Sequence, residues 1–475
     1  MLMKWKRKAK RIKKAKKVRV QMKNKIVEEL KEILGKEKVK VELEDLISHS
    51  YDGYIKESLP DAVVFPETTD DVVKVVKLAN KENFYITPRG SGSNLCGGSV
   101  PKKGGIVLSF TKMNKTIEIN KENRYAILQP GKILDELQSE IDEVGLFYPV
   151  DLGSSRIATI GGSVALNSGG MRAIKYGVTR DYILGLKVVL ANGEIINTGV
   201  LAKKNVVGYD LTSLICGSEG TLGIITEVIV RLIVKPSYRK VILNHYSTIN
   251  DACNTVVEVL KRSIPSAIEI MDNLVINAVE DFLRIGLLRD AGALLLIELD
   301  GNELQVEEDA KIILEICKNN KSIKTEISKN VAETEKLWLA RKSSFGSMAR
   351  YKPICIAEDI TVPVTYLKDV MSRLYELTKK HEVLFGLISH AGDGNLHPHF
   401  LLDKKEDEQK VDIIMEEIMP YIVSIGGTIS GEHGVGIGKK KFLNMQLKNS
   451  EIAIMKEIKK LFDPKGIINP GSFID

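Results

Sequence analysis

The chain has 475 residues, more than one hydrophobic core usually organises, so two or three lobes are expected. Its 44% hydrophobic and 28% charged residues are typical of a globular protein, and no apolar run approaches the roughly 18 residues of a membrane span. The net charge of +7 comes from eleven Lys and Arg among residues 1–21, and the rest of the chain is slightly acidic. Because the body is not basic, nucleic acid is excluded as a main partner.

Residues 1–21 form a basic extension that we expect to be disordered, and two interpretations of it stay open. It lacks the apolar core of a secretory signal, so it is not one. As a solvated basic arm, it could contact nucleic acid, an anionic membrane or an acidic partner. Alternatively, translation starts at Met22, where an amphipathic helix begins. The five cysteines are scattered, odd in number and not spaced for a metal site. They predict a cytoplasmic protein without a cysteine-ligated iron–sulfur cluster.

The first half of the chain alternates between helix and strand patterns, which predicts an α/β lobe. Apolar residues recur at helical spacing from Lys25 to about Leu34. A strand that ends at Pro66 is followed by a helix to Asn80, capped by Thr69-Asp70-Asp71. Further strands are expected at residues 85–88, 106–108 and 183–190, and the pattern ends near residues 231–232.

The pattern changes after about Ser237. From there to Leu384, strands such as 293–299 alternate with long charged helices such as 306–319. This predicts a second, α+β lobe inserted between the first lobe and the C-terminus. The tail after Phe462 is rich in Pro, Gly and Asn, and we expect it to return to the body of the protein.

Three glycine-punctuated segments of the first lobe predict one extended ligand wrapped by several loops. They are residues 89–98, 151–165 and 205–226. Glycine lets backbone N–H groups approach a pyrophosphate closely, and serine hydroxyls add donors. Neither of the first two segments fits the dinucleotide fingerprint, which argues against a Rossmann-type NAD site.

Four of the seven histidines lie between residues 388 and 438: His390, His397, His399 and His433. Each stands near glycine or proline, which would break a helix or a central strand, so we expect them on bent loops that converge. Two imidazoles and a carboxylate bind a divalent cation, and a further imidazole can move a proton near neutral pH. The segment therefore predicts a reaction centre.

Taken together, these segments resemble the FAD-linked oxidoreductases of the vanillyl-alcohol oxidase/p-cresol methylhydroxylase superfamily, in the branch of the glycolate oxidase FAD subunit and the D-lactate dehydrogenases. Six matching segments follow the family's order: residues 88–98, 159–170, 204–226, 390–398, 430–436 and 463–471. The resemblance implies an α+β fold. A two-subdomain FAD-binding lobe (22–236) would be followed by an inserted α+β substrate or cap domain with the metal site (237–440) and a C-terminal segment that returns to the FAD lobe (441–475).

The resemblance also implies FAD, bound non-covalently because the first glycine-rich loop contains no histidine. Residues 89–94 and 153–163 would line the pyrophosphate and isoalloxazine, residues 219–225 would cover the adenosine side, and Asn469 of the tail would reach the flavin. The residues expected to bind FAD are Pro88, Arg89, Gly90, Ser91, Gly92, Ser93, Asn94, Gly153, Ser154, Thr159, Gly161, Gly162, Ser163, Glu219, Gly220, Gly223, Ile225 and Asn469.

In the resembled 2-hydroxy-acid dehydrogenases, two histidines and a glutamate hold a divalent metal, here His390, His397 and Glu432, with Zn, Fe or Mn as candidates. His433 would take the hydroxyl proton while hydride leaves Cα for flavin N5. Arg341 would clamp the substrate carboxylate. The resemblance gives His399 no role.

The expected substrate is a short monocarboxylate, D-lactate or glycolate, oxidised to the 2-oxo acid. Relatives that act on D-2-hydroxyglutarate place a lysine where this chain has Ile356-Ala357-Glu358. Electrons are expected to pass to a partner, an electron-transfer flavoprotein or an iron–sulfur subunit. Two alternatives stay open: a metal-dependent hydrolase without flavin, and a non-catalytic FAD-binding subunit of an oxidase complex.

Overall fold

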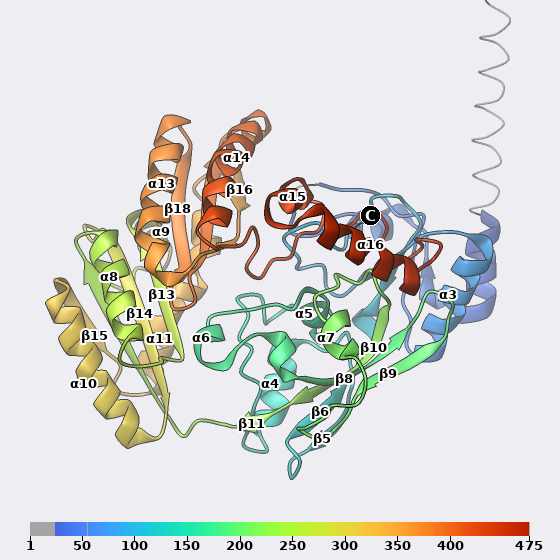
Figure 1. Cartoon of the computed structure of the whole chain (residues 1–475), viewed down its shortest axis with the longest axis horizontal. Coiled ribbons are helices and arrows are strands. Elements are labelled where there is room, and N and C mark those ends of the chain that lie inside the picture. Colours follow the sequence, from blue (N-terminus) through green and yellow to red (C-terminus); the bar gives the residue numbers. More distant parts are fainter. Residues whose placement is uncertain (1–23, 55, 475) are drawn as a thin grey trace, which may run out of the picture.

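A computed structural model describes residues 24–54 and 56–474, so the predicted basic extension lies outside the described residues. Figure 1 shows two lobes side by side, one built from the first half of the chain together with the C-terminal segment, and one from residues 237 to about 430. Within the described ranges, no helix is both long and apolar enough to cross a bilayer.

The first lobe begins with a helix over residues 24–34 and a small sheet. Its strand order is β1 (Val39–Lys40), β2 (Ala62–Val64), β4 (Ile106–Ser109) and β3 (Ile86–Arg89), with β2, β4 and β3 parallel. Helix α3 (Thr69–Glu82) connects β2 to β3, and its apolar side is buried against the sheet. The cap of α3 is one residue earlier than predicted, because Thr68 Oγ1 accepts the N–H of Asp71 at 3.1 Å.

A second, antiparallel sheet completes the first lobe. Its order is β5 (Thr116–Asn120), β6 (Tyr125–Leu128), β10 (Ile224–Arg231), β8 (Ile183–Val189) and β9 (Ile195–Gly199). Helices α4 (Leu134–Asp142) and α5 (Ile160–Leu166) contribute to the core on this sheet, and a short pair links β7 (Leu146–Phe147) to β11 (Ile233–Val234). Helices α6 (Ala173–Tyr176) and α7 (Leu211–Ile215) are short.

The second lobe is one large sheet covered on both faces. The strand order is β15 (Ser322–Ile327), β12 (Tyr238–Tyr246), β14 (Ala293–Gly301), β13 (Ala267–Asp272), β18 (Leu384–His390), β19 (Asn395–Leu402) and β16 (Ile354–Ala357), with β17 (Ile360–Thr361) also on β19. Burial on both faces explains the continuous apolar runs in β14 and β18.

Helices on the two faces of this sheet belong to different cores. One face packs against α8 (Ile249–Leu260), α10 (Glu303–Asn319), α13 (Leu367–Lys380) and α14 (Glu408–Ser424). The other packs against α9 (Asn273–Leu283), α11 (Val331–Lys342) and α12 (Ser344–Met348), and it also contacts Met171 of the first lobe. This second face is therefore the one that meets the first lobe. The alternate residues of each strand whose side chains point to this face are brought to the junction between the lobes.

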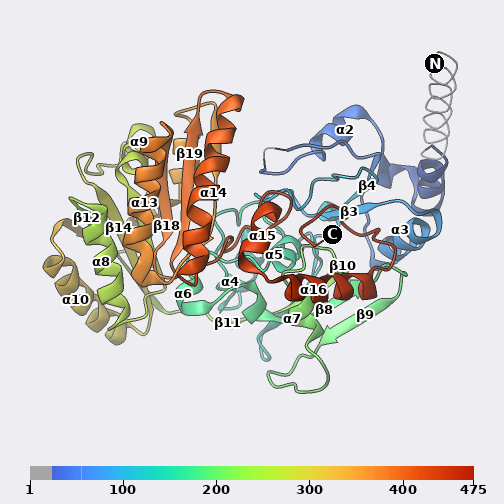
Figure 2. The ribbon, with the colours of Figure 1, turned by 45° about the horizontal axis from the view of Figure 1, so that its top comes forward.

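The C-terminal segment runs back over the first lobe, as Figure 2 shows for α16 (Asn449–Phe462). After α15 (Leu443–Gln446) and α16, the buried side chains of Ile467 and Ile468 join the core of the parallel sheet. Ile468 forms an isolated bridge with Ile86, and Lys459 donates to the carbonyls of Thr221 and Ile468. These bonds tie the chain end to the strand that leads into the first glycine-rich loop.

Candidate active site

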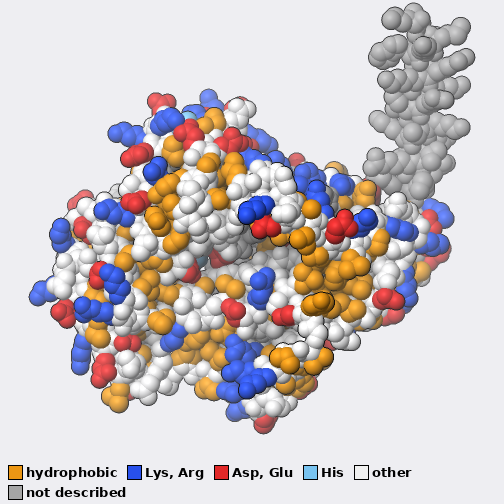
Figure 3. Space-filling model, in the orientation of Figure 1, with side chains coloured by type: hydrophobic (Ala, Val, Ile, Leu, Met, Phe, Trp, Pro, Cys, Tyr) orange, Lys and Arg blue, Asp and Glu red, His pale blue; other side chains and the backbone are white. Residues whose placement is uncertain are grey.

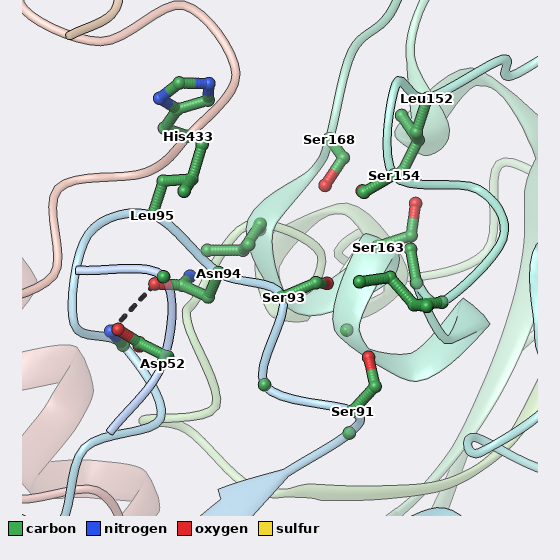
Figure 4. A pocket seen from close by; sticks show the side chains of 18 of the residues that line it. Asp52, Ser91, Ser93, Asn94, Leu95, Leu152, Ser154, Ser163, Ser168 and His433 are labelled. Carbon is green, nitrogen blue, oxygen red and sulfur yellow. Dashed lines mark hydrogen bonds between the residues drawn. The ribbon is translucent and has the colours of Figure 1, made fainter. Parts of the chain in front are cut away.

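A cavity of about 810 Å³ lies between the two lobes, where Figure 3 shows a hollow in the surface. Glycine-rich loops of the first lobe form one part of its wall, and the histidine cluster of the second lobe forms another. Figure 4 shows the side chains of Ser91, Ser93, Ser154 and Ser163 around the same space, with His433 also at its edge. Two sets of residues far apart in the sequence thus meet in one cavity.

The first two glycine-rich loops can meet only because specific positions lack a side chain. A Cβ at Gly90 would lie 2.2 Å from Thr159 Oγ1, and a Cβ at Gly161 would lie 2.6 Å from the Cβ of Pro130. The Asn94 side chain holds the first loop in a turn by accepting the N–H groups of Cys96 (2.8 Å) and Gly98 (3.0 Å). Removal of Cβ therefore serves loop-to-loop contact as well as ligand access.

All but one of the residues expected to bind FAD line this cavity. The exception is Asn469, whose amide donates to the carbonyls of Gly98 (3.0 Å) and Glu219 (2.8 Å) and so connects two loops of the wall. Glu219 lines the cavity, but its buried carboxylate accepts the N–H groups of Val435 (2.7 Å) and Gly436 (2.8 Å). It thereby ties the cofactor-side wall to the loop that carries His433.

The third glycine-punctuated segment is only partly at the cavity, and the part that reaches it is the part expected to bind the cofactor, residues 219–225. Residues 219, 220, 223 and 225 line the wall, whereas Val206 and Tyr209 are 96% and 95% exposed. Figure 2 shows the connection between β9 and α7 standing away from the body. The glycine at residue 208 serves this exposed turn, and a turn glycine has the same sequence signature as one at a ligand.

His390, His397 and His399 stand on regular strands, not on the bent loops predicted from their glycine and proline neighbours, whereas His433 lies on a bent turn as predicted. His390 ends β18 and His397 lies in β19, and the register pairs Ile388 with His397. Alternation along the two strands puts both imidazoles on the face toward the first lobe. Pro398 lies opposite Glu358, in the two-residue gap between β16 and β17, and its carbonyl accepts the Glu358 N–H at 2.9 Å, so the proline removes only the reciprocal bond of that pair.

His390, His397 and Glu432 offer ligand atoms that lie within 4.8 Å of one another. Glu432 Oε1 is 3.1 Å from His397 Nε2 and 3.5 Å from His390 Nε2. Two imidazole nitrogens and a carboxylate oxygen form a donor set suited to a divalent cation. The side chains that the sequence groups as metal ligands are thus together.

His390 is held on its other nitrogen by a residue that the sequence did not single out. Burial lowers the pKa of His390, but the carboxylates of Glu269 and Glu432 outweigh it and raise the pKa to about 10. Glu269 Oε1 is 2.8 Å from Nδ1, so Nδ1 donates to Glu269 and Nε2 faces Glu432. This arrangement orients Nε2 toward the ligand cluster.

His433 has the properties of a base. Burial lowers its pKa to about 4, so the imidazole is neutral at neutral pH and can accept a proton. Its ring stacks on His397, with centroids 5.0 Å apart. His399 also lines the cavity, but its Nδ1 bonds the carbonyl of His397 at 2.7 Å and its ring contacts Phe345.

Asp359 is a second unpredicted residue, and it shapes the turn that carries Glu432 and His433. Its fully buried Oδ2 accepts the N–H groups of residues 431 (2.8 Å), 432 (3.0 Å) and 433 (2.9 Å) and the Ser430 hydroxyl (2.7 Å). Burial raises the pKa of Asp359, but the charge of Lys439, the nearby histidines and the N–H donors outweigh it and hold the pKa well below the usual range.

Replacing Asp359 with asparagine should destabilise this turn, since an amide NH₂ would face backbone N–H donors. We expect the free energy of unfolding, measured by urea denaturation, to fall by about 3 kcal/mol. The exposed Asp403, paired with Lys352, provides a control, and Asp403→Asn should change it by less than about 0.5 kcal/mol. Equal stabilities for the two variants would contradict the role given to Asp359.

Comparisons with known proteins match the chain over both lobes. A family described as "FAD linked oxidases, C-terminal domain" matches residues 235–473, and one described as "FAD binding domain" matches residues 60–199. The chain is 42% identical to the glycolate oxidase subunit GlcD of Bacillus subtilis (strain 168) over 94% of the chain and 96% of that protein. It is 34% identical to a D-lactate dehydrogenase of Anaerostipes hadrus, with 94% and 96% covered.

Solved structures give the same fold. The p-cresol methylhydroxylase structure with bound substrate superposes with a TM-score of 0.81 at 20% identity, over 96% of this chain and 97% of that one. An alkyldihydroxyacetonephosphate synthase superposes with a TM-score of 0.74 at 20% identity, over 94% of this chain and 86% of that one. These likenesses confirm the predicted α+β, FAD-binding fold.

Proposed function

The chain belongs to the FAD-linked oxidases, and on that premise we propose that this FAD-linked oxidoreductase oxidises a short D-2-hydroxy acid, such as D-lactate, or glycolate, to the 2-oxo acid. The observation that carries the proposal is a single cavity in which His433, Arg341 and the cluster around Glu432 face the FAD-binding loops. The printed names of the relatives from Bacillus subtilis and Anaerostipes hadrus support the same substrate class.

The cavity suits a non-covalent flavin. Its first loop offers Ser91, Gly92, Ser93 and Asn94, and none of these has the nucleophilic ring that a histidyl-flavin bond requires. The buried Ser91 hydroxyl has no hydrogen-bond partner among the described residues, so a ligand oxygen would satisfy it. When bound, FAD supplies the redox chemistry by accepting the hydride from the substrate Cα.

A divalent cation, Zn, Fe or Mn, would be held by His390, His397 and Glu432. Their donor atoms converge, and His390 already has its second nitrogen occupied by a carboxylate, as metal-bound histidines usually do. When bound, such a cation supplies a Lewis acid for the substrate hydroxyl and carboxylate.

The residues of this chain would position the substrate and take its proton. His433 would accept the hydroxyl proton at its neutral imidazole as the hydride leaves Cα, which balances the two-electron oxidation. Arg341 would bind the carboxylate through its terminal nitrogens, because its Nε already donates to Glu269 at 2.6 Å.

A small monocarboxylate is the proposed substrate because this chain has Ile356-Ala357-Glu358 where relatives that act on a dicarboxylate place a lysine. Ala357 and Phe345 line both the main cavity and a side pocket of about 40 Å³. That side pocket carries charges of both signs, because Glu358 and Lys439 line it and Glu358 Oε2 lies 3.7 Å from Lys439 Nζ. The proposal of lactate or glycolate therefore rests on residues 356–358 and on the printed names of the relatives.

Electrons would leave to a partner protein, an electron-transfer flavoprotein or an iron–sulfur subunit. All five cysteines are free and none joins a metal-binding group within the described part of the chain. The Bacillus subtilis relative is itself named a subunit. The free cysteines also support our inference of a cytoplasmic location.

Anaerobic reduction of the purified protein by a panel of D- and L-2-hydroxy acids tests the proposal. We expect a yellow protein whose flavin is bleached by D-lactate or glycolate and not by L-lactate or D-2-hydroxyglutarate. A colourless preparation would favour the metal-dependent hydrolase. A yellow protein that no hydroxy acid bleaches would favour the non-catalytic subunit, and bleaching by L-isomers alone would overturn the assigned stereochemistry.

A further inference from the structure

Glu269 is a fully buried carboxylate that contacts both a proposed metal ligand and the proposed substrate clamp. It lies in β13, opposite His390 of β18 in the strand register, and its side chain has no exposed surface. Its Oε1 is 2.8 Å from His390 Nδ1, and its Oε2 is 2.6 Å from Arg341 Nε. His390 and Arg341 both line the cavity, whereas Glu269 lies behind them, outside the lining.

A carboxylate buried in this position needs compensating interactions. A carboxylate without solvent is costly unless it is paired and its lone pairs are hydrogen-bonded. Glu269 meets this condition only through His390 and Arg341, because those two side chains provide its hydrogen bonds from side chains among the described residues. His390 uses its Nδ1 and Arg341 uses its Nε to bond Glu269, and both side chains also line the cavity.

The two contacts fix complementary features of the site. In a neutral His390 ring the bond to Nδ1 places the lone pair on Nε2, the nitrogen that faces Glu432 at 3.5 Å and would bind the cation. The bond to Arg341 Nε fixes the plane of the guanidinium, whose Nη2 also lies 3.4 Å from His390 Nδ1, and the remaining terminal N–H groups are left for a carboxylate. Rotation of the Glu269 side chain would therefore disturb both groups together.

We propose that Glu269 is a positioning residue that couples the two halves of the substrate site, so that affinity for the metal and affinity for the hydroxy acid depend on the same buried carboxylate. The inference rests on the proposed function, since it takes His390 as a metal ligand and Arg341 as the substrate clamp. Glu269 touches neither the cation nor the substrate, and it acts through these two residues.

The test compares wild-type protein with Glu269→Gln, each loaded with FAD. Metal-free protein is titrated by calorimetry with Zn²⁺ alone and with Mn²⁺ alone, and steady-state oxidation of D-lactate and glycolate with an artificial electron acceptor gives KM and kcat after metal is restored. For Glu269→Gln we expect metal affinity to fall about 10- to 100-fold. KM should rise by a similar factor, and kcat at saturating metal and substrate should change much less.

Glu298 provides a matched control on the adjacent strand β14. It is also fully buried, and it pairs with Arg239 (2.5 Å) and Arg172 (3.2 Å), none of which lines the cavity. Glu298→Gln should lower stability while leaving metal affinity and KM as in the wild type. If Glu269→Gln does not retain FAD, Glu269→Asp, which keeps the charge and is one methylene shorter, is measured with the same expectation.

The outcomes separate the inference from the function on which it rests. Wild-type protein that binds neither ion, or whose flavin no hydroxy acid reduces, would overturn the proposed function. Wild-type protein that does both, beside a Glu269→Gln variant with unchanged metal affinity and KM, would overturn only the coupling. Unfolding of both Glu269 variants while Glu298→Gln stays folded would assign Glu269 to stability alone and would also overturn it.

Discussion

Replacing His433 with asparagine is expected to slow flavin reduction by D-lactate about a thousandfold at neutral pH, the middle of the range for loss of a general base. Asparagine fills a similar volume, but its amide cannot accept a proton in this pH range. The His433 imidazole is neutral there because burial lowers its pKa to about 4. Anaerobic stopped-flow measurement of flavin bleaching gives the rate directly.

This variant should keep the rest of the site intact. Asp359 holds position 433 through the backbone N–H at 2.9 Å, which the substitution does not remove. FAD content and metal content should therefore equal those of the wild type. His245→Asn, which changes a buried histidine of β12 outside the cavity lining, should leave the bleaching rate unchanged. If His433→Asn bleached at the wild-type rate, His433 would not be the base, and a non-catalytic role for the chain would gain support.

The elements that the sequence could predict are those whose signals are local. The helix after Thr68 has a cap and apolar residues at helical spacing, and the loops around Gly90 and Gly161 carry glycines with serines. Family resemblance then ordered these segments and grouped the histidines with Glu432. Local chemistry and motif order were sufficient because a cofactor cavity needs particular residue types at each of these positions.

Glu269 and Asp359 could not be found in this way, because their roles depend on strand register. Glu269 is 121 residues before His390, and only the pairing of β13 with β18 brings them together. Asp359 stands where the strand beside β19 is interrupted, opposite the histidine-bearing segment. An acid within an apolar strand such as β13 was an available signal, since a buried carboxylate needs partners, but it does not identify them.

The exposed turn around Gly208 and the strand position of Pro398 are cases in which a local sequence signal was over-interpreted. In both, a local signal was assigned a meaning that tertiary structure decides. Glycine is required equally at a surface turn and at a ligand, and a proline can remove one N–H from a sheet without ending the strand that carries it. Beside Pro398 the strand register continues on both sides, and the Glu358 N–H donates to the Pro398 carbonyl at 2.9 Å.

Removing the metal is expected to have an effect as large as removing the base. We expect chelation to leave FAD bound and the protein yellow, while flavin reduction by D-lactate slows about a thousandfold, because a Lewis acid contributes several kcal/mol and about 1.4 kcal/mol is tenfold in rate. Adding Zn²⁺ or Mn²⁺ back should restore the rate. The glycine-rich loops that we propose to hold FAD and the cluster around Glu432 belong to different parts of the wall, which is why the cofactor should be retained.

Glu432→Gln separates loss of the ion from any other effect of the chelator. Glutamine preserves the shape of the side chain and the backbone bond from residue 432 to Asp359, but it removes the negative charge that faces His390 and His397. Metal content and bleaching rate should fall together, and added metal should not restore the rate. Glu227→Gln, which alters a carboxylate paired with Lys187 in the first lobe, should change neither quantity. If Glu432→Gln lost its metal and kept the wild-type rate, the cation would have no part in the reaction, and the proton step at His433 would have to proceed without it.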